Sequence, residues 1–438
     1  MSTASLPSYS PPSPLPRTPS YTAEPLSDER RLTQGRLPIR RVRPPVADVV
    51  KQNKSGTISL RLTQAQRIEG DNPVYGARGP VEGTVELSRT DGVVYVAAKI
   101  EGVLKLKEVA AGGTTTLVLC DETAFLWRKG IDDGPCPIHL PFSVVLPATF
   151  ADEKGSYPLP PTYEAHLSGL PGFQANVQYS VTAVASRSRN TRLNIGAISV
   201  STPFVFHPRS RPSLPIPPPL SRSHVRPGLD ITPQWKSHES VITSRVPGSR
   251  DILCTLYLPK SQVFCIKETI PFHVSFVSSA MSLASLLPYV PTNTPANTNR
   301  YTRIQLLRQT SVDAKNDYVP AGTKTEMWRV ASLGEGSFWR TSDGPDWITF
   351  SGELKVSPNV QLGGFKAGGL WVKDCIVFSI SPPDSLKGPI GDLREVYPIR
   401  LVTDPWESGP RAGMIQRESS AGSDESTYEQ PYLAYAGH

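Results

Sequence analysis

Short segments in which every second residue is apolar recur along most of this chain of 438 residues. At Ile58–Leu62 and Val94–Ile100 apolar residues alternate with other residues, and this is the period of a half-buried β-strand. Turn signals such as Thr90-Asp91-Gly92 separate the segments, and no stretch of twelve residues keeps a 3.6-residue period without Pro or Gly. Many short strands at regular spacing predict an all-β protein built from antiparallel β-sandwiches.

The predicted strands fall into two groups, which we interpret as two immunoglobulin-like β-sandwich domains in tandem, at 54–208 and 236–405. Eight prolines between His207 and Pro233 predict a semi-rigid, extended linker at 209–235. The other predicted strands are Val81–Leu87, Phe142–Leu146 and Val177–Ala183 in the first group, and Ile252–Leu258, Ile270–Phe276, Ile304–Leu306, Met327–Arg329, Ile348–Phe350, Leu354–Val356, Val372–Phe378 and Ile399–Leu401 in the second.

Both ends of the chain have the composition of disordered tails. Residues 1–53 carry ten prolines, many Ser and Thr and almost no apolar period, so they cannot bury enough surface to offset the loss of chain entropy. Residues 406–438 are acidic and rich in Ser and Gly. Proline makes up 45 of the 438 residues, roughly twice the usual ~5%.

The formal charge of +7 is distributed unevenly along the chain. Residues 1–54 hold 9 basic and 4 acidic residues (+5), and residues 406–438 hold 2 and 5 (−3). The basic cluster Arg40, Arg41 and Arg43 is a candidate contact with an anionic membrane surface, and a solvated chance cluster is the alternative. Without aromatic interleaving or zinc-finger spacing, the sequence does not predict nucleic-acid binding.

Cysteine usage and the N-terminal sequence predict a cytoplasmic protein. The five cysteines never form a C-x-x-C pair, which fits buried free thiols in a reducing compartment. No signal peptide is visible at the N-terminus, and the longest apolar runs are far shorter than the ~20 residues that span a bilayer.

No catalytic constellation appears in the sequence, so we expect no enzyme activity, no metal and no cofactor. The seven histidines are scattered, and none pairs with another at metal-ligand spacing. Glu164 and His166 share one face of a predicted strand, either as half of an acid–base pair or simply as a solvated face. The glycine cluster Gly363–Gly369 lacks the Lys and Ser/Thr of a phosphate-binding loop and is interpreted as a β-turn or bulge.

Proline next to tyrosine is the most informative motif. Pro160-Pro161-Thr162-Tyr163 is a strict P-P-x-Y sequence, and two looser copies in the N-terminal tail contain Pro7 with Tyr9 and Pro19 with Tyr21. Such segments dock on the aromatic grooves of WW domains because their extended conformation is already formed. The copy with Pro160, Pro161 and Tyr163 is also compatible with a structural bend that leads into a strand.

Three possible phosphorylation sites flank the two tail copies. Ser10, Ser13 and Thr18 each precede a proline, and a phosphate there would add about −1.5 to −2 charges beside the docking prolines. We expect phosphorylation of these residues to change WW binding.

The first group of strands resembles the N-terminal domain of the arrestin family, especially the arrestin-like trafficking adaptors of fungi. The most specific element is a succession similar to the family's F-x-x-x-L-P, L-P-x-S/T-Y/F and Y-x-V-x-A motifs. The second group resembles an arrestin C-terminal domain through its order and length. The residues that carry the first resemblance are Pro73–Gly76, Val81–Val85, Ile100–Gly102, Phe142–Pro147, Leu159–Tyr163 and Tyr179–Ala183.

This resemblance implies a non-catalytic adaptor that binds membrane-protein cargo and brings it to endocytic and ubiquitin-ligase machinery, peripherally at the plasma membrane or endosomes. In fungal relatives, P-P-x-Y motifs recruit HECT-type ubiquitin ligases through WW domains. Such motifs usually lie in the C-terminal tail, whereas this chain has only Gln430-Pro431-Tyr432 there. The alternative is a retromer-type sorting or scaffold subunit with the same fold and no ligase link.

Overall fold

The computed structural model describes residues 48–406, except for 64–66, 70, 77–78, 110–113, 153–154, 169–171, 188–195, 221–232, 292–299, 315–324 and 385–386. By its internal contacts the chain divides after Pro45 into two units. The first unit lies outside the described residues, and the second holds every strand reported below.

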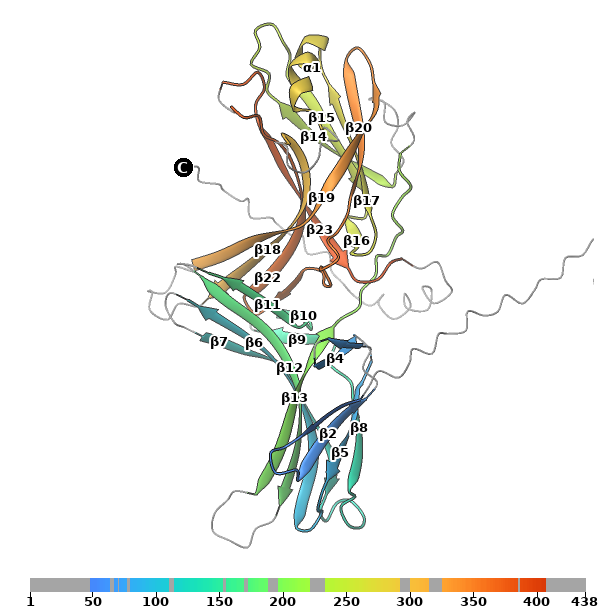
Figure 1. Ribbon diagram of the computed structural model, residues 1–438, viewed down its shortest axis with the longest axis vertical. Coiled ribbons are helices and arrows are strands. Elements are labelled where there is room, and N and C mark those ends of the chain that lie inside the picture. Colours follow the sequence, from blue (N-terminus) through green and yellow to red (C-terminus); the bar gives the residue numbers. More distant parts are fainter. Residues whose placement is uncertain are drawn as a thin grey trace, which may run out of the picture. The chain divides into compact units, whose positions relative to one another are not determined.

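The first part of the second unit consists of strands (Figure 1). Their bounds are β1 Val49–Gln52, β2 Ile58–Thr63, β3 Arg67–Glu69, β4 Asn72–Gly76, β5 Val81–Leu87, β6 Val93–Glu108, β7 Thr114–Arg128, β8 His139–Val144, β9 Thr149–Asp152, β10 Gly155–Pro158, β11 Tyr163–Leu167, β12 Phe173–Arg187 and β13 Ala197–His207.

These strands form three sheets among the described residues. One sheet has the order β1-β2-β5-β8, and a larger one has the order β3-β4-β13-β12-β6-β7 with β11 also paired to β12. Strands β9 and β10 form a separate hairpin. All pairings are antiparallel except that of β4 with β13, which is parallel.

The second part is a ten-stranded sheet with one short helical region. Its path is β14-β15-β17-β20-β19-β18-β22-β23-β16, with β21 paired to β22, and its only parallel pairing joins β16 to β23. The bounds are β14 Trp235–Ile242, β15 Ile252–Pro259, β16 Val263–Cys265, β17 Ile270–Val277, α1 Ala280–Leu286, η2 Leu287–Tyr289, β18 Thr302–Ala314, β19 Thr325–Asp343, β20 Trp347–Leu354, β21 Phe365–Ala367, β22 Leu370–Ile380 and β23 Leu393–Val402.

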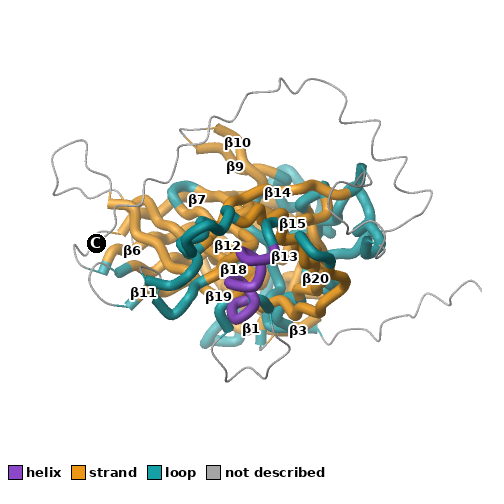
Figure 2. Tube along the Cα trace, turned by 90° about the horizontal axis from the view of Figure 1, so that it is seen from above, coloured by secondary structure: helices purple, strands orange, loops and turns teal. Residues whose placement is uncertain are grey.

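Period-2 alternation explains why these segments are strands. In β12 every second side chain is buried, so one face of the strand enters the core and the other remains more accessible. The inward series is Phe173, Ala175, Val177, Tyr179, Val181, Ala183 and Ala185. Figure 2 shows the described chain as strands and loops with helix confined to α1 and η2, so the prediction of an all-β fold is confirmed.

Two clusters of buried apolar side chains form the cores. The first cluster takes most of its members from β2, β5, β6 and β12, but it also contains Val312 of β18 together with Ala367, Leu370 and Val372 of the β21–β22 hairpin. The second cluster lies within β14–β23 and α1. The tandem arrangement of two domains, with its proposed boundaries, stays a prediction.

The structure differs from the sequence expectations at three places. Strand β1 lies inside the predicted tail 1–53, where it pairs with β2 through backbone groups and shows no alternating burial. The first part of the predicted linker, residues 209–220, packs on the second group of strands. Helix α1 has seven residues, and a helix of this length is too short to display a helical period in the sequence.

The packed proline-rich segment has specific partners. The Arg209 guanidinium donates two hydrogen bonds to the Asp404 carboxylate, one of them at 3.0 Å from Nε, and the backbone N–H of Ser210 donates to the Thr403 hydroxyl at 2.9 Å. Pro212 and Pro217 are buried. Proline composition alone does not distinguish this packed segment from a free linker, because both are extended.

Candidate functional site

The strict P-P-x-Y sequence lies between β10 and β11 and is packed into the protein. Pro160 and Pro161 are both buried. The Tyr179 hydroxyl donates a hydrogen bond to the Pro160 carbonyl at 2.6 Å. Thr162 is held to Phe206 in β13 by two hydrogen bonds of 2.9 Å, one from its backbone N–H and one to its hydroxyl. The segment is therefore held by β12 through Tyr179 and by β13 through Phe206.

Tyr163 connects this segment to residues far away in the sequence. Its side chain is half-buried, its hydroxyl lies 2.8 Å from the Thr310 hydroxyl in β18, and its ring meets the Phe365 ring edge-to-face at 5.1 Å. A WW domain could reach Pro160, Pro161 and Tyr163 only if this packing opened. The geometry favours the structural-bend interpretation, and docking at this copy stays a prediction.

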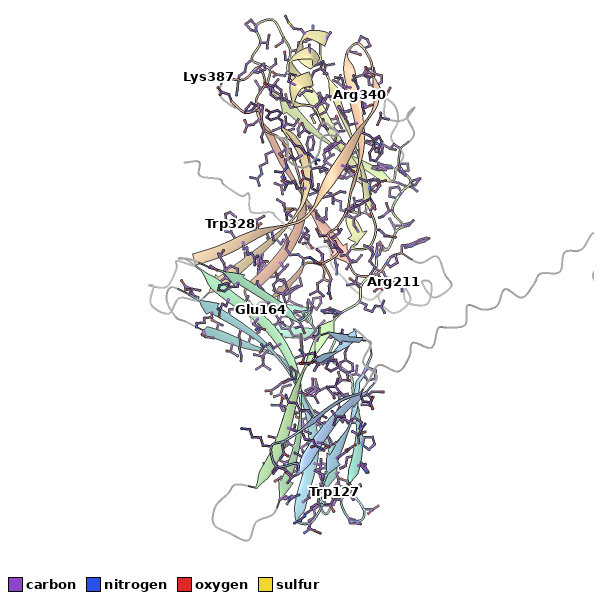
Figure 3. All side chains as sticks on the ribbon, viewed as in Figure 1. Trp127, Glu164, Arg211, Trp328, Arg340 and Lys387 are labelled. Carbon is purple, nitrogen blue, oxygen red and sulfur yellow. The ribbon has the colours of Figure 1, made fainter. Side chains whose placement is uncertain are left out.

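Glu164 and His166 lie side by side on the exposed face of β11, where Figure 3 shows Glu164. They face Asn176 and Gln174 across the register with β12, so the neighbouring strand supplies amides rather than a second acid or base. On the main chain, the His166 carbonyl accepts a hydrogen bond from Arg329 at 3.1 Å. This arrangement is that of a solvated strand face with a backbone contact.

A buried ion pair lies on the inward face of β18 and β22. Arg308 donates to both Asp374 carboxylate oxygens, at 2.7 Å from Nε and 3.1 Å from Nη2, and Nη2 also donates to the Leu362 carbonyl at 2.6 Å. The sequence analysis missed this pair. The sequence does mark Asp374 as unusual, because it is the one charged residue among the inward-facing residues of β22. It does not identify the partner, because Arg308 is 66 residues away in the chain.

His273 is a second buried polar centre missed by the sequence analysis. Its Nε2 accepts a hydrogen bond from the backbone N–H of Leu220 in the proline-rich segment at 3.0 Å, and its Nδ1 lies 2.8 Å from the Ser351 hydroxyl in β20. Burial lowers the pKa of this imidazole to about 4. The neutral side chain thus links residues 209–220 to β17 and β20, and its role is structural.

Strand β7 is the edge strand of its sheet, because among the described strands it pairs only with β6; β8 and β9 of the other sheets lie near it without pairing to it. It is fifteen residues long, and the side chains of Val118 and Phe125 are each 54% exposed. Its backbone groups on the side away from β6 have no strand partner among the described residues. A long open edge with exposed apolar side chains can accept an additional extended segment.

Two clusters of sequence candidates lie outside the described residues. The first comprises the tail motifs and their possible phosphorylation sites, and the second comprises the basic cluster. They are Pro7, Tyr9, Ser10, Ser13, Thr18, Pro19, Tyr21, Arg40, Arg41 and Arg43.

The described residues contain no group of three or more His, Cys, Asp or Glu side chains that could hold a metal ion. All five cysteines are free. Within the same residues, no helix is long and apolar enough to cross a membrane. The glycine cluster contains the turn between β21 and β22, with Gly368 and Gly369 at positive φ, and a side chain at Gly363 would collide with the Leu401 carbonyl.

In comparisons with known proteins, no family model matches the chain and no curated protein matches it.

Proposed function

We propose that this protein is a non-catalytic, arrestin-like adaptor that binds membrane-protein cargo and links it to a HECT-type ubiquitin ligase and the endocytic machinery. It would act in the cytoplasm, peripherally at the plasma membrane or endosomes. The all-β architecture supports a binding scaffold, and the motif resemblance from Phe142 to Ala183 supports this family.

The observation that carries the binding role is the open edge of β7. An extended segment from a partner can add to this edge through main-chain hydrogen bonds, while Val118 and Phe125 offer apolar contacts. Such an edge is usually protected by charges or covered by other elements unless it serves a partner. Residues Thr114–Cys120 carry no charge, so the N-terminal half of β7 has no charged side chains to protect its edge.

The ligase link rests on the two N-terminal copies. Since Pro160 and Pro161 are buried, the copies with Tyr9 and Tyr21 are the better candidates for a WW domain. Burial of the one strict copy also favours a second candidate function, that of a retromer-type sorting or scaffold subunit without a ligase link.

Pull-down of the full chain by isolated WW domains of a HECT-type ligase separates these two functions. We expect the parent protein to bind, and Tyr9→Ala together with Tyr21→Ala to abolish binding. Tyr432→Ala in the incomplete C-terminal motif is the control and should bind like the parent. Absence of binding by the parent would leave the sorting or scaffold function.

The cargo role is tested by proximity labelling in cells. Thr116→Lys with Val118→Lys places two charges on the β7 edge, which should prevent strand addition while leaving the melting temperature unchanged because Val118 is exposed. We expect membrane proteins among the partners of the parent and their loss in this variant. Unchanged labelling would contradict a role for the β7 edge.

A further inference from the structure

The outer face of the sheet formed by β19, β18, β22 and β23 combines exposed aromatic and apolar side chains with cations. The register places Trp328, Ser311, Trp371 and Lys366 in one row across β19, β18, β22 and β21, and Val330, Gln309 and Lys373 in the next. The side chains of Trp328 and Val330 are 54% and 47% exposed. Figure 3 labels Trp328 on this sheet.

Lysine ammonium groups surround the Trp371 ring. The Nζ atoms of Lys366 and Lys373 each lie 4.5 Å from the centroid of that ring, and Lys366 is also 4.9 Å from the centroid of Tyr157 in β10. These cation–π contacts hold both ammonium groups against the sheet but leave their charges without a counter-ion. Neither lysine forms an ion pair with the described residues.

Strand β23 extends the positive face. Its outward residues alternate as Arg394, Val396, Pro398 and Arg400, and all four are exposed. Because Asp374 faces Ile399, the same antiparallel register places Lys373 opposite Arg400. Neither arginine side chain forms an ion pair among the described residues. Glu335 on this face is already paired with Arg303 at 3.0 Å and with Arg300 at 3.8 Å, and the register places two further acids, Asp313 and Glu326, in the row beyond Ser311 and Trp328.

We propose that this surface, defined by Trp328, Val330, Lys366, Trp371, Lys373, Arg394 and Arg400, binds an acidic segment of a partner protein in an extended conformation. The inference deepens the proposed adaptor function and rests on it for the nature of the partner. The segment is acidic because its carboxylates would supply the counter-ions that four cations of the surface, Lys366, Lys373, Arg394 and Arg400, lack among the described residues. The exposed Trp328 and Val330 add an apolar contact for a neighbouring side chain of the segment.

The spacing of the cations favours a peptide over a lipid surface. Outward residues two apart on a strand are about 6.6–6.8 Å from each other, and this is also the distance between alternate side chains of an extended peptide. Arg394 and Arg400 are six residues apart on β23, about 20 Å, so carboxylates six positions apart in such a peptide can face both, with Lys373 beside Arg400. A lipid headgroup would engage only the cations beside Trp371, whereas an extended segment can also reach Arg394, which lies six residues from Arg400 along β23.

The test measures binding of the full chain to a short fluorescein-labelled peptide in which Glu alternates with Ser around one central Leu. We expect the Glu peptide to bind and its Gln counterpart to bind weakly, with affinity falling as salt rises. Lys373→Glu with Arg400→Glu should lower the affinity about tenfold or more, the loss expected for two exposed ion pairs. Trp328→Ser should weaken binding with little change in melting temperature, because Trp328 is mostly exposed.

The matched control is Lys105→Glu with Lys107→Glu on the exposed face of β6, which reverses the same number of charges elsewhere. An equal loss of affinity in this control would overturn the proposal, because it would show that the net charge of the protein, and not this surface, determines binding of the peptide. Vesicles of phosphatidylcholine with phosphatidylserine form the second arm, and binding to vesicles but not to the Glu peptide would also overturn the proposal. Since the peptide assay contains neither ligase nor membrane, a failure here combined with intact WW binding would reject the surface and not the adaptor function.

Discussion

Tyr163 shows at the level of one residue how a motif can be structural. Its hydroxyl is 2.8 Å from that of Thr310, its ring packs on Phe365, and the prolines before it are buried. Tyr163→Ala removes an aromatic side chain whose full burial would be worth about 3–5 kcal/mol, and less here because the ring is half-buried. We expect a lower melting temperature by calorimetry and unchanged WW binding.

The same calorimetric experiment on Tyr9→Ala with Tyr21→Ala should show the opposite behaviour, with an unchanged melting temperature and lost WW binding. A Tyr163→Ala protein that melts like the parent and no longer binds a WW domain would reverse the assignment of the two kinds of motif.

His273 is expected to make stability depend on pH. Burial lowers its pKa to about 4 in the folded protein, whereas an unfolded histidine titrates near ~6.5. The unfolded state therefore binds a proton first as the pH falls, so the contribution of His273 to stability is fully present above about pH 6.5 and is lost between there and about pH 4. A shift of this size corresponds to about 3 kcal/mol at most.

Urea unfolding at several pH values measures this dependence. His273→Gln keeps an amide oxygen that can accept from the Leu220 N–H but cannot titrate, so we expect it to lose less stability than the parent between pH 6.5 and pH 4. Identical pH dependence in the two proteins would assign the acid sensitivity to other groups.

At the level of elements, β18 and β22 are joined by a buried ion pair as well as by their register. Asp374→Ala would leave the Arg308 guanidinium buried without its carboxylate, and breaking such a pair costs about 3–5 kcal/mol. Chemical denaturation should show this loss. Arg308→Met with Asp374→Leu removes both charges and should recover most of the stability, because an apolar pair of similar volume needs no counter-ion. Equal destabilisation of the single and double variants would show that packing rather than charge is responsible.

The elements also show what the sequence could predict. Strands such as β12 were predictable because period-2 alternation requires only that one face be buried. The two parallel pairings were not predictable, because the paired strands are far apart in the sequence: β4 and β13 are separated by more than 100 residues. The packing of residues 209–220 depends on Asp404 and His273, which lie far away in the sequence, and the same distance hid the partner of Asp374.

For the candidate sites, the sequence identified the P-P-x-Y segment but could not show that its prolines are buried. The outer surface of β18–β23 was not predictable either. Its outward residues Trp371, Lys373 and Arg400 are ordinary solvent-side residues of their own strands, and only the register brings them together. The pairing of strands determines which outward residues become neighbours on a sheet, and the periodicity of a single strand carries no information about that pairing.

At the level of the whole molecule, the first hydrophobic cluster joins strands from both parts of the chain. Leu370 of β22 belongs to this cluster, although most of the cluster comes from β2, β5, β6 and β12. Ile376 of the same strand belongs to the second cluster, and both side chains are fully buried. One strand thus contributes to two cores. A substitution at Leu370 should therefore affect the strands of the first cluster, and a substitution at Ile376 those of the second.

Hydrogen exchange measured by mass spectrometry tests this division with a matched pair. Leu370→Ala and Ile376→Ala each create a cavity with a cost of about 2–5 kcal/mol. We expect Leu370→Ala to speed exchange in β6 and β12, which precede it by more than 180 residues, because it removes a packing partner of their shared cluster. Ile376→Ala should instead speed exchange in β15 and β17. If exchange in β6 and β12 is unaffected by Leu370→Ala, the part before His207 is stable by itself, and the contacts that join it to β22 contribute little to its stability.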